Sequence, residues 1–203
     1  MKPSSILIQE HCLIEQVLAS LERMAERCES GRQLEGGPAR DALRFLRGFA
    51  ERCHCGKVEV QLLPTMRAMG ISQERCLGGS ILHRREEGRS HLAAMEAAIE
   101  PASAGDAPAL DEFAEHARAY IELLLEYMAK QEDCLLPMIT QALPEPDKTR
   151  LTRALAAACG DGQAERAIDP YVDLANRLAD HFAVPRAVAA GPHGNRGAKE
   201  RAE

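Results

Sequence analysis

The chain has 203 residues, of which 45% are hydrophobic and 3% aromatic, and its formal net charge at pH 7 is -6. This length and apolar content suit one core of ordinary size with a smaller appendage. The acidic balance, with arginines scattered along the chain, excludes the basic stripe of a nucleic-acid-binding protein and the polybasic anchor of a membrane-surface protein.

Helix-favouring residues dominate the sequence and strand-like alternation is scarce, so we predict the all-α class. Four long helices are expected over residues 4–28, 38–70, 80–99 and 109–143, the second kinked at Pro64 and the third capped by Ser80. Their short connections favour an antiparallel up-down-up-down four-helix bundle over residues 1–143. Residues 144–184 are expected to form two short helices, near 147–159 and 169–183, that pack on this bundle. Residues 185–203, which are small and polar, are typical of a disordered tail.

Each long helix carries a polar side chain on its apolar stripe, where helical spacing places it in the interior. These side chains are His11, His54, Arg85, Tyr127 and Gln131. Bundles build metal and cofactor sites from inward-facing side chains on neighbouring helices. We therefore expect the five side chains to converge at one level of the bundle.

Four segments carry a specific resemblance: "QEHCLIEQVLASLERM", "FAERCHCGKVEVQLLPTM", "HRREEGRSHLAAM" and "YIELLLEYMAKQEDCLLPM". In this order and spacing, they resemble the successive segments of a hemerythrin-like, HHE cation-binding domain over residues 1–143. The later "LPEPDKTRLTRAL" and "YVDLANRLADHF" resemble the C-terminal extension of the bacterial members. The resemblance implies a bundle that binds two non-haem irons through histidines and bridging carboxylates, and that handles or senses oxygen, nitric oxide or iron.

The metal ligands implied by the resemblance are mostly replaced in this chain. His11 and His54 stand where the family has histidines. Four other ligand positions, which the family fills with glutamate, histidine, histidine and glutamate, hold Val58, Arg85, Tyr127 and Gln131. Both carboxylates are therefore lost, and one imidazole becomes a guanidinium with no lone pair to donate.

A fixed guanidinium in the same cavity repels a metal ion by roughly 4 kcal/mol per unit charge at 4 Å, for an effective dielectric constant near 20. We therefore do not expect the two-iron centre to assemble. Arg85 needs a partner inside the bundle, and Glu15 and Glu59 are the nearest candidates by helical geometry.

A single zinc or non-haem iron is a second hypothesis, since His11, His54 and Glu59 supply imidazole and carboxylate ligands. Cys12, Cys53 or Cys55 could supply a thiolate ligand to such a site. Alternatively, the cysteines are small buried side chains, the usual fate of free cysteine in a helix. A redox role would need a partner on another helix, and Cys12, Cys28 and Cys134 are the candidates.

Two functions from different classes follow. The first is a hemerythrin-type oxygen, nitric oxide or iron protein with an altered mononuclear site at His11 and His54, to which Tyr127 could add a phenolate. The second is a metal-free bundle with a regulatory or interaction role, or one that binds a small anion or an unidentified partner through Arg85, Tyr127 and Gln131. No nucleophile motif favours an enzyme.

The sequence also predicts the cellular location of the protein. The longest apolar runs, "LAAMEAAI" and "YIELLL", are shorter than the roughly 18 residues of a membrane span, and "MKPSSILIQEH" has too short an apolar region for a signal peptide. Seven cysteines without framework spacing fit a reducing compartment. We expect a cytoplasmic protein whose cysteines are mostly thiols, and we expect His91 and His116 at its surface.

Overall fold

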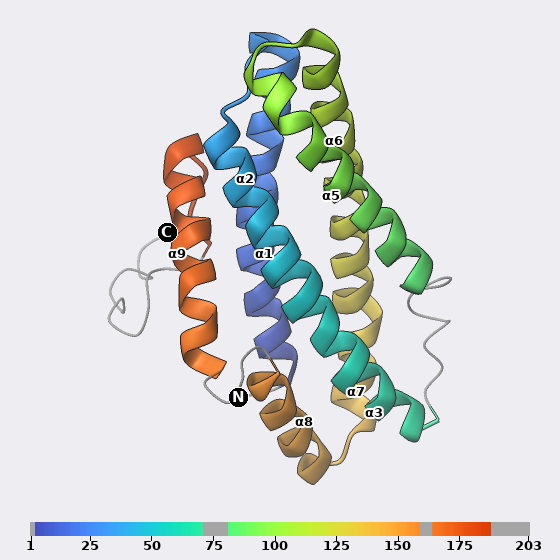
Figure 1. Ribbon diagram of the computed structural model, residues 1–203. Helices are drawn as coiled ribbons and strands as arrows, with labels where there is room; N and C mark the ends of the chain where they lie inside the picture. Colours follow the sequence, from blue (N-terminus) through green and yellow to red (C-terminus); the bar gives the residue numbers. More distant parts are fainter. Residues whose placement is uncertain (1–2, 71–80, 159–163, 188–203) are drawn as a thin grey trace, which may run out of the picture.

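The computed structural model describes residues 3–70, 81–158 and 164–187, and every regular element in these ranges is a helix (Figure 1). The all-α class predicted from the sequence is confirmed. Among the described residues, none of the helices combines the length and the apolar character needed to cross a bilayer. The predicted cap at Ser80 and most of the predicted tail lie outside the described residues.

The first predicted helix is α1 (Pro3–Glu26), which continues as a π-helical turn, η1 (Arg27–Gly31). Its buried face is almost entirely apolar, with Glu10, His11, Gln16 and Ser20 as the buried polar members. The helix ends at Arg32, whose φ of 49° is left-handed and whose backbone N–H bonds to the carbonyl of Arg27.

The second predicted helix is divided into four consecutive helical segments. These are α2 (Gly36–Phe45), the π-helical segments η2 (Leu46–Cys55) and η3 (Val58–Leu62), and α3 (Leu63–Ala68). Pro64 lies in the first turn of α3, directly after the π-helical turns of η3. A π-helical segment has wider turns than an α-helix, so it rotates the following side chains out of the 3.6-residue pattern.

The third and fourth predicted helices are α5 (Ile81–Ser103) and a run of α6 (Ala107–Lys130), η4 (Gln131–Leu135) and α7 (Leu136–Ala142). They are antiparallel, since Arg84 near the start of α5 pairs with Glu126 near the end of α6. Gly88 allows a close approach here, because a Cβ at this position would lie 3.2 Å from a methyl group of Leu123.

The long helices run side by side in alternating directions (Figure 1). Contacts fix the alignment of α1 with the fourth helix: His11 meets Gln131, and Glu22 meets Arg118. This alignment brings η2, η4 and the first half of α1 to the same level, where the buried polar side chains lie.

The two C-terminal helices, α8 (Glu145–Ala157) and α9 (Ala164–Phe182), pack on the long helices. The ring of Tyr171 from α9 lies 6.0 Å from Phe45 and 5.6 Å from Phe49, measured between centroids. Gly48 makes this approach possible, because any Cβ there would collide with the Tyr171 ring. The buried Gln16 of α1 also donates a hydrogen bond to Asn176 of α9, at 3.1 Å.

Candidate functional site

Two histidines from different helices meet in the interior. His11 of α1 is 1% exposed and His54 of η2 is fully buried. Their ring centroids lie 4.8 Å apart, in an edge-to-face arrangement. These are the two ligand positions implied by the resemblance that keep a histidine in this chain, and the fold brings the two rings together.

His54 is held by a buried ionic group. Its Nδ1 lies 3.0 Å from Oε2 of Glu10, and the ammonium of Lys57, only 1% exposed, donates to the other oxygen of the same carboxylate. Burial alone would raise the pKa of Glu10, but the hydrogen bonds and charges of His54 and Lys57 outweigh it and hold this pKa below its ordinary value. Glu10 is therefore ionised at neutral pH.

His11 is held at both ring nitrogens by the start of η4. Its Nδ1 lies 2.6 Å from Oε1 of Glu132, and its Nε2 lies 3.2 Å from Oε1 of Gln131. Burial and the neighbouring His54 lower the pKa of His11, which favours the neutral ring. A neutral ring that donates from Nδ1 has a lone pair at Nε2, and the Gln131 amide group, whose nitrogen has no partner, can turn to satisfy it.

Both histidines share one arrangement: a carboxylate orients Nδ1 and leaves Nε2 for another partner. This is how metal-ligating histidines are usually held. The Nε2 atom of His54 is buried and has no hydrogen-bond partner. Among the described residues, however, no group of three or more histidine, cysteine or acidic side chains is arranged to hold a metal ion.

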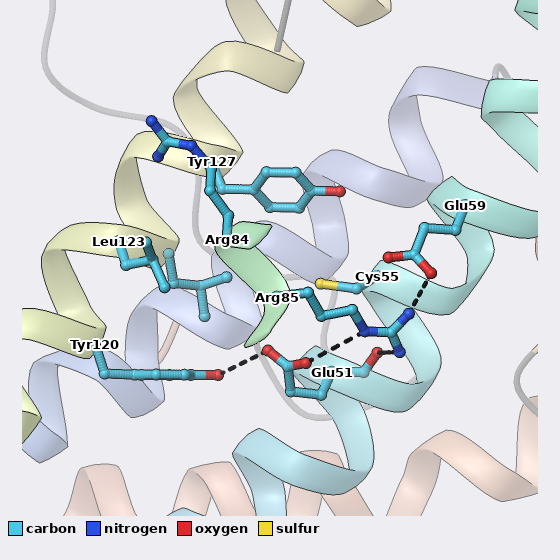
Figure 2. Close-up of a pocket in the computed structure, with 9 residues that line it drawn as sticks. Glu51, Cys55, Glu59, Arg84, Arg85, Tyr120, Leu123 and Tyr127 are labelled. Atoms are coloured by element: carbon cyan, nitrogen blue, oxygen red, sulfur yellow. Dashed lines mark hydrogen bonds and ion pairs between the residues drawn. The ribbon is translucent and has the colours of Figure 1, made fainter. Parts of the chain in front are cut away.

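Arg85 lies in a second cluster, with two carboxylates (Figure 2). Its guanidinium donates to Glu59, its Nε lies 3.6 Å from Oε2 of Glu51, and its Nη2 lies 3.4 Å from the Glu51 carbonyl oxygen. The side chain is 21% exposed. Glu59 is thus the expected partner, Glu51 is an unexpected one, and Glu15 makes no ion pair with Arg85.

A cavity of about 30 Å³ opens within this second cluster, room for one or two water molecules. It is lined in part by Glu51, Cys55, Glu59, Arg85 and Tyr127. Figure 2 shows the Tyr127 ring extending above Cys55 towards the Glu59 side. Four buried polar atoms of the cluster have no hydrogen-bond partner: Glu51 Oε2, Glu59 Oε1, Arg85 Nε and the Tyr127 hydroxyl.

Burial raises the pKa values of three groups that line this cavity. It raises the pKa of Glu51, although Arg85 and Arg89 oppose the rise. It also raises the pKa of the Tyr127 hydroxyl and that of the Cys55 thiol far above their ordinary values. A phenolate or thiolate ligand is therefore costly to form here unless a metal ion itself stabilises the anion.

The five predicted interior side chains divide between these two clusters. His11, His54 and Gln131 lie in the first, which we call the histidine cluster, together with Glu10, Lys57 and Glu132. Arg85 and Tyr127 lie in the second, the arginine cluster. Four of the five are buried and Arg85 is partly buried. Tyr127 and Gln131, four residues apart, do not bond each other, because the Tyr127 hydroxyl has no partner and the Gln131 carbonyl faces His11.

The proposed metal ligands are similarly divided. His11 and His54 are adjacent, but Glu59 belongs to the arginine cluster, where Arg85 occupies its carboxylate. Cys53 is disulfide-bonded, as is Cys134, so neither is a thiolate ligand and the expectation of thiols fails for both. Cys12, Cys28 and Cys55 are free thiols.

Several members of the clusters were not predicted: Glu10, Glu51, Lys57 and Glu132. Lys57 and Glu51 are off the 3.6-residue stripe of the second helix, yet they are buried, because more than one face of this helix is covered. Glu10 has a sequence signal, since it directly precedes His11 and the residues three and four positions away on either side are all apolar: Ile6, Leu7, Leu13 and Ile14. An acidic residue next to a histidine on an apolar stripe is therefore a signal that could have identified Glu10.

The chain matches no family model, no curated protein and no solved structure. The resemblance to hemerythrin-like domains therefore rests on the four sequence segments alone.

Proposed function

We propose that this chain is a hemerythrin-like antiparallel four-helix bundle that does not hold a two-iron centre and acts as a non-enzymatic regulatory or interaction module. One observation carries the proposal: the guanidinium of Arg85, at a position where the family has a histidine, lies between Glu51 and Glu59. The position that would donate a lone pair to a metal supplies a permanent positive charge instead.

Charge balance in the interior supports the same proposal. Lys57 neutralises Glu10 in the histidine cluster, and Arg85 neutralises Glu59 in the arginine cluster. Among the described residues, Glu10 and Glu59 already pair with cations of the chain, and Glu132 is bonded to His11. Two iron ions would bring at least four positive charges into this interior without adding any ligand charge.

A small anion is a poorer occupant than the sequence suggests. An anion at Arg85 would lie beside Glu51 and Glu59, both of which already contact the guanidinium. Like charges at this range in a partly buried site repel strongly. We therefore assign the arginine cluster to stabilisation of the bundle and not to anion binding.

A second candidate function is a single non-haem iron or zinc at His11 and His54, in an oxygen, nitric oxide or iron protein of hemerythrin type. The observation that favours it is the buried Nε2 of His54, which has no partner in a ring already oriented by Glu10. Gln131 and Tyr127 would have to complete such a site.

Elemental analysis of the full chain, purified without added metal, separates the two candidates. The metal-free proposal expects iron and zinc far below one ion per chain. Close to one tightly bound ion, lost in the His54→Ala variant but kept in His181→Ala, would overturn it in favour of the mononuclear site. His181 is a suitable control because it is an exposed histidine that pairs with Glu35.

Restoring the family's ligands tests the hemerythrin-like register. The quadruple variant Val58→Glu, Arg85→His, Tyr127→His and Gln131→Glu completes the six positions together with His11 and His54. We expect it to take up iron anaerobically and to show oxo-bridged absorption bands on oxygenation. The matched control keeps Arg85 and carries the other three changes, and it should take up far less. A folded quadruple variant without iron would mean that the alignment with the family is wrong.

A further inference from the structure

A pair of histidines outside the two clusters joins α5 to α6. His91 and His116 were expected to be independent surface residues, yet their side chains meet across the interface of the two helices. Both are partly buried. Neither belongs to the histidine cluster or the arginine cluster, and nothing in the proposed function uses them.

The two rings face each other through the same nitrogen. Nδ1 of His91 lies 2.9 Å from Nδ1 of His116, and the ring centroids are 5.2 Å apart. In the absence of another ligand, one nitrogen must carry a proton and donate to the lone pair of the other. Burial and the neighbouring His116 lower the pKa of His91, so this ring is neutral near pH 7.

We propose that His91 and His116 form a binding site for a divalent transition-metal ion, which replaces the shared proton and links α5 to α6. Imidazole nitrogens bind such ions at about 2.0–2.1 Å. If the two nitrogens stay 2.9 Å apart, the angle between the two metal–nitrogen bonds is about 90°. Each ring would have to rotate so that its lone pair points at the ion and no longer at the other nitrogen. Neighbouring positions of a square-planar or octahedral ion have this angle, which points to Cu²⁺ or Ni²⁺.

The surrounding charges suit a cation. Glu87, one helical turn before His91, and Glu115, next to His116, are the acidic neighbours that act on His91. The nearby Arg118 is bound by Glu22 and Glu29. Because no third ligand is in place among the described residues, water and one of these exposed carboxylates would complete the coordination.

Titration of the metal-stripped full chain with Ni²⁺ alone, followed by calorimetry, tests the site. We expect one bound ion, and binding weakened in both His91→Ala and His116→Ala by more than the roughly 10- to 100-fold that loss of an outer-sphere partner costs. The matched control, His181→Ala, should bind like the parent. Ni²⁺ should also raise the melting temperature of the parent, and not of either variant, because it would tie α5 to α6.

Electron paramagnetic resonance of the Cu²⁺-loaded chain gives an independent reading. Two equatorial nitrogens are expected in the parent and one in His91→Ala. The proposal is overturned if the parent binds no Ni²⁺, or if both variants bind it like the parent. Either result would leave the pair as a hydrogen bond, and neither would bear on the interior clusters, to which His91 and His116 do not belong.

Discussion

The histidine cluster and the arginine cluster both bury carboxylates, but the pKa values of these carboxylates shift in opposite directions. Glu10, in the first, receives bonds from His54 and Lys57 on both of its oxygens. Glu51, in the second, has only a long contact to Arg85 and a weak one from Tyr120, at 3.5 Å. The pKa of Glu10 is held below its ordinary value, and burial raises that of Glu51 above it.

The comparison teaches that the bonding partners of a buried carboxylate decide the direction in which its pKa shifts. Desolvation acts on both groups and by itself would raise both pKa values. Only where donors fill the oxygens is that effect reversed. The group of Glu10, His54 and Lys57 is thus closed around its carboxylate, although Nε2 of His54 and the amide nitrogen of Gln131 have no partner. The arginine cluster is more open, with four unpartnered polar atoms.

The largest effect is expected from breaking the closed cluster. Lys57→Met removes the ammonium and leaves the Glu10 carboxylate buried with His54 alone. We expect the free energy of unfolding to fall by about 3 to 5 kcal/mol, the usual cost of removing one partner from a buried ion pair. Urea unfolding followed by circular dichroism measures it.

The matched control is Lys130→Met, which removes an ammonium from the more exposed pair with Glu126. It should cost less than about 1 kcal/mol. Equal losses in the two variants would show that the histidine cluster is open to water, and the contrast between the clusters would be lost.

A smaller effect is expected from Arg85→Ala. The arginine is 21% exposed, and its carboxylate partners can be hydrated or protonated when it is removed. We therefore expect a loss of about 1 to 2 kcal/mol in the same urea assay. A loss as large as that of Lys57→Met would mean that the arginine cluster is as closed as the histidine cluster.

The smallest effects should be changes of stability with pH, which have opposite signs for Glu10 and Glu51. The folded-state pKa of Glu10 is lowered, so its contribution to stability is present above its unfolded value, near 4.5, and is lost as the pH falls through the folded pKa. The folded-state pKa of Glu51 is raised, so its contribution is present below 4.5 and is lost as the pH rises through the folded pKa.

The signs can be measured as the free energies of unfolding in urea of two single variants, each at pH 7 and at pH 4. Glu10→Gln should be less stable than the parent at pH 7, and the difference should shrink at pH 4. Glu51→Gln should be slightly more stable than the parent at pH 7 and equal to it at pH 4. The same sign for both variants at pH 7 would contradict the comparison.

Much of the fold could be predicted from the sequence, because helical periodicity and Pro or Gly breaks are local signals. Each long helix was expected within a few residues of its observed bounds, as were α8 and α9. The inward direction of His11, His54 and Gln131 also followed from spacing alone. These predictions succeed because a helix must bury its apolar face whatever its neighbours are.

The division of the interior into two clusters was decided by the tertiary structure. Periodicity gives the face of a helix, but the partner of each side chain depends on how far one helix slides along another and on where π-helical turns rotate it. That is why the sequence left Glu59 either with a metal at His11 and His54 or beside Arg85, and why Lys57 was missed. The sequence by itself determined that four helices carry polar side chains on their inward faces, among them His11, His54 and Gln131. Only the packing of those helices decided which charge neutralises which, because ionic contacts form over about 3 Å, a distance smaller than one helical turn.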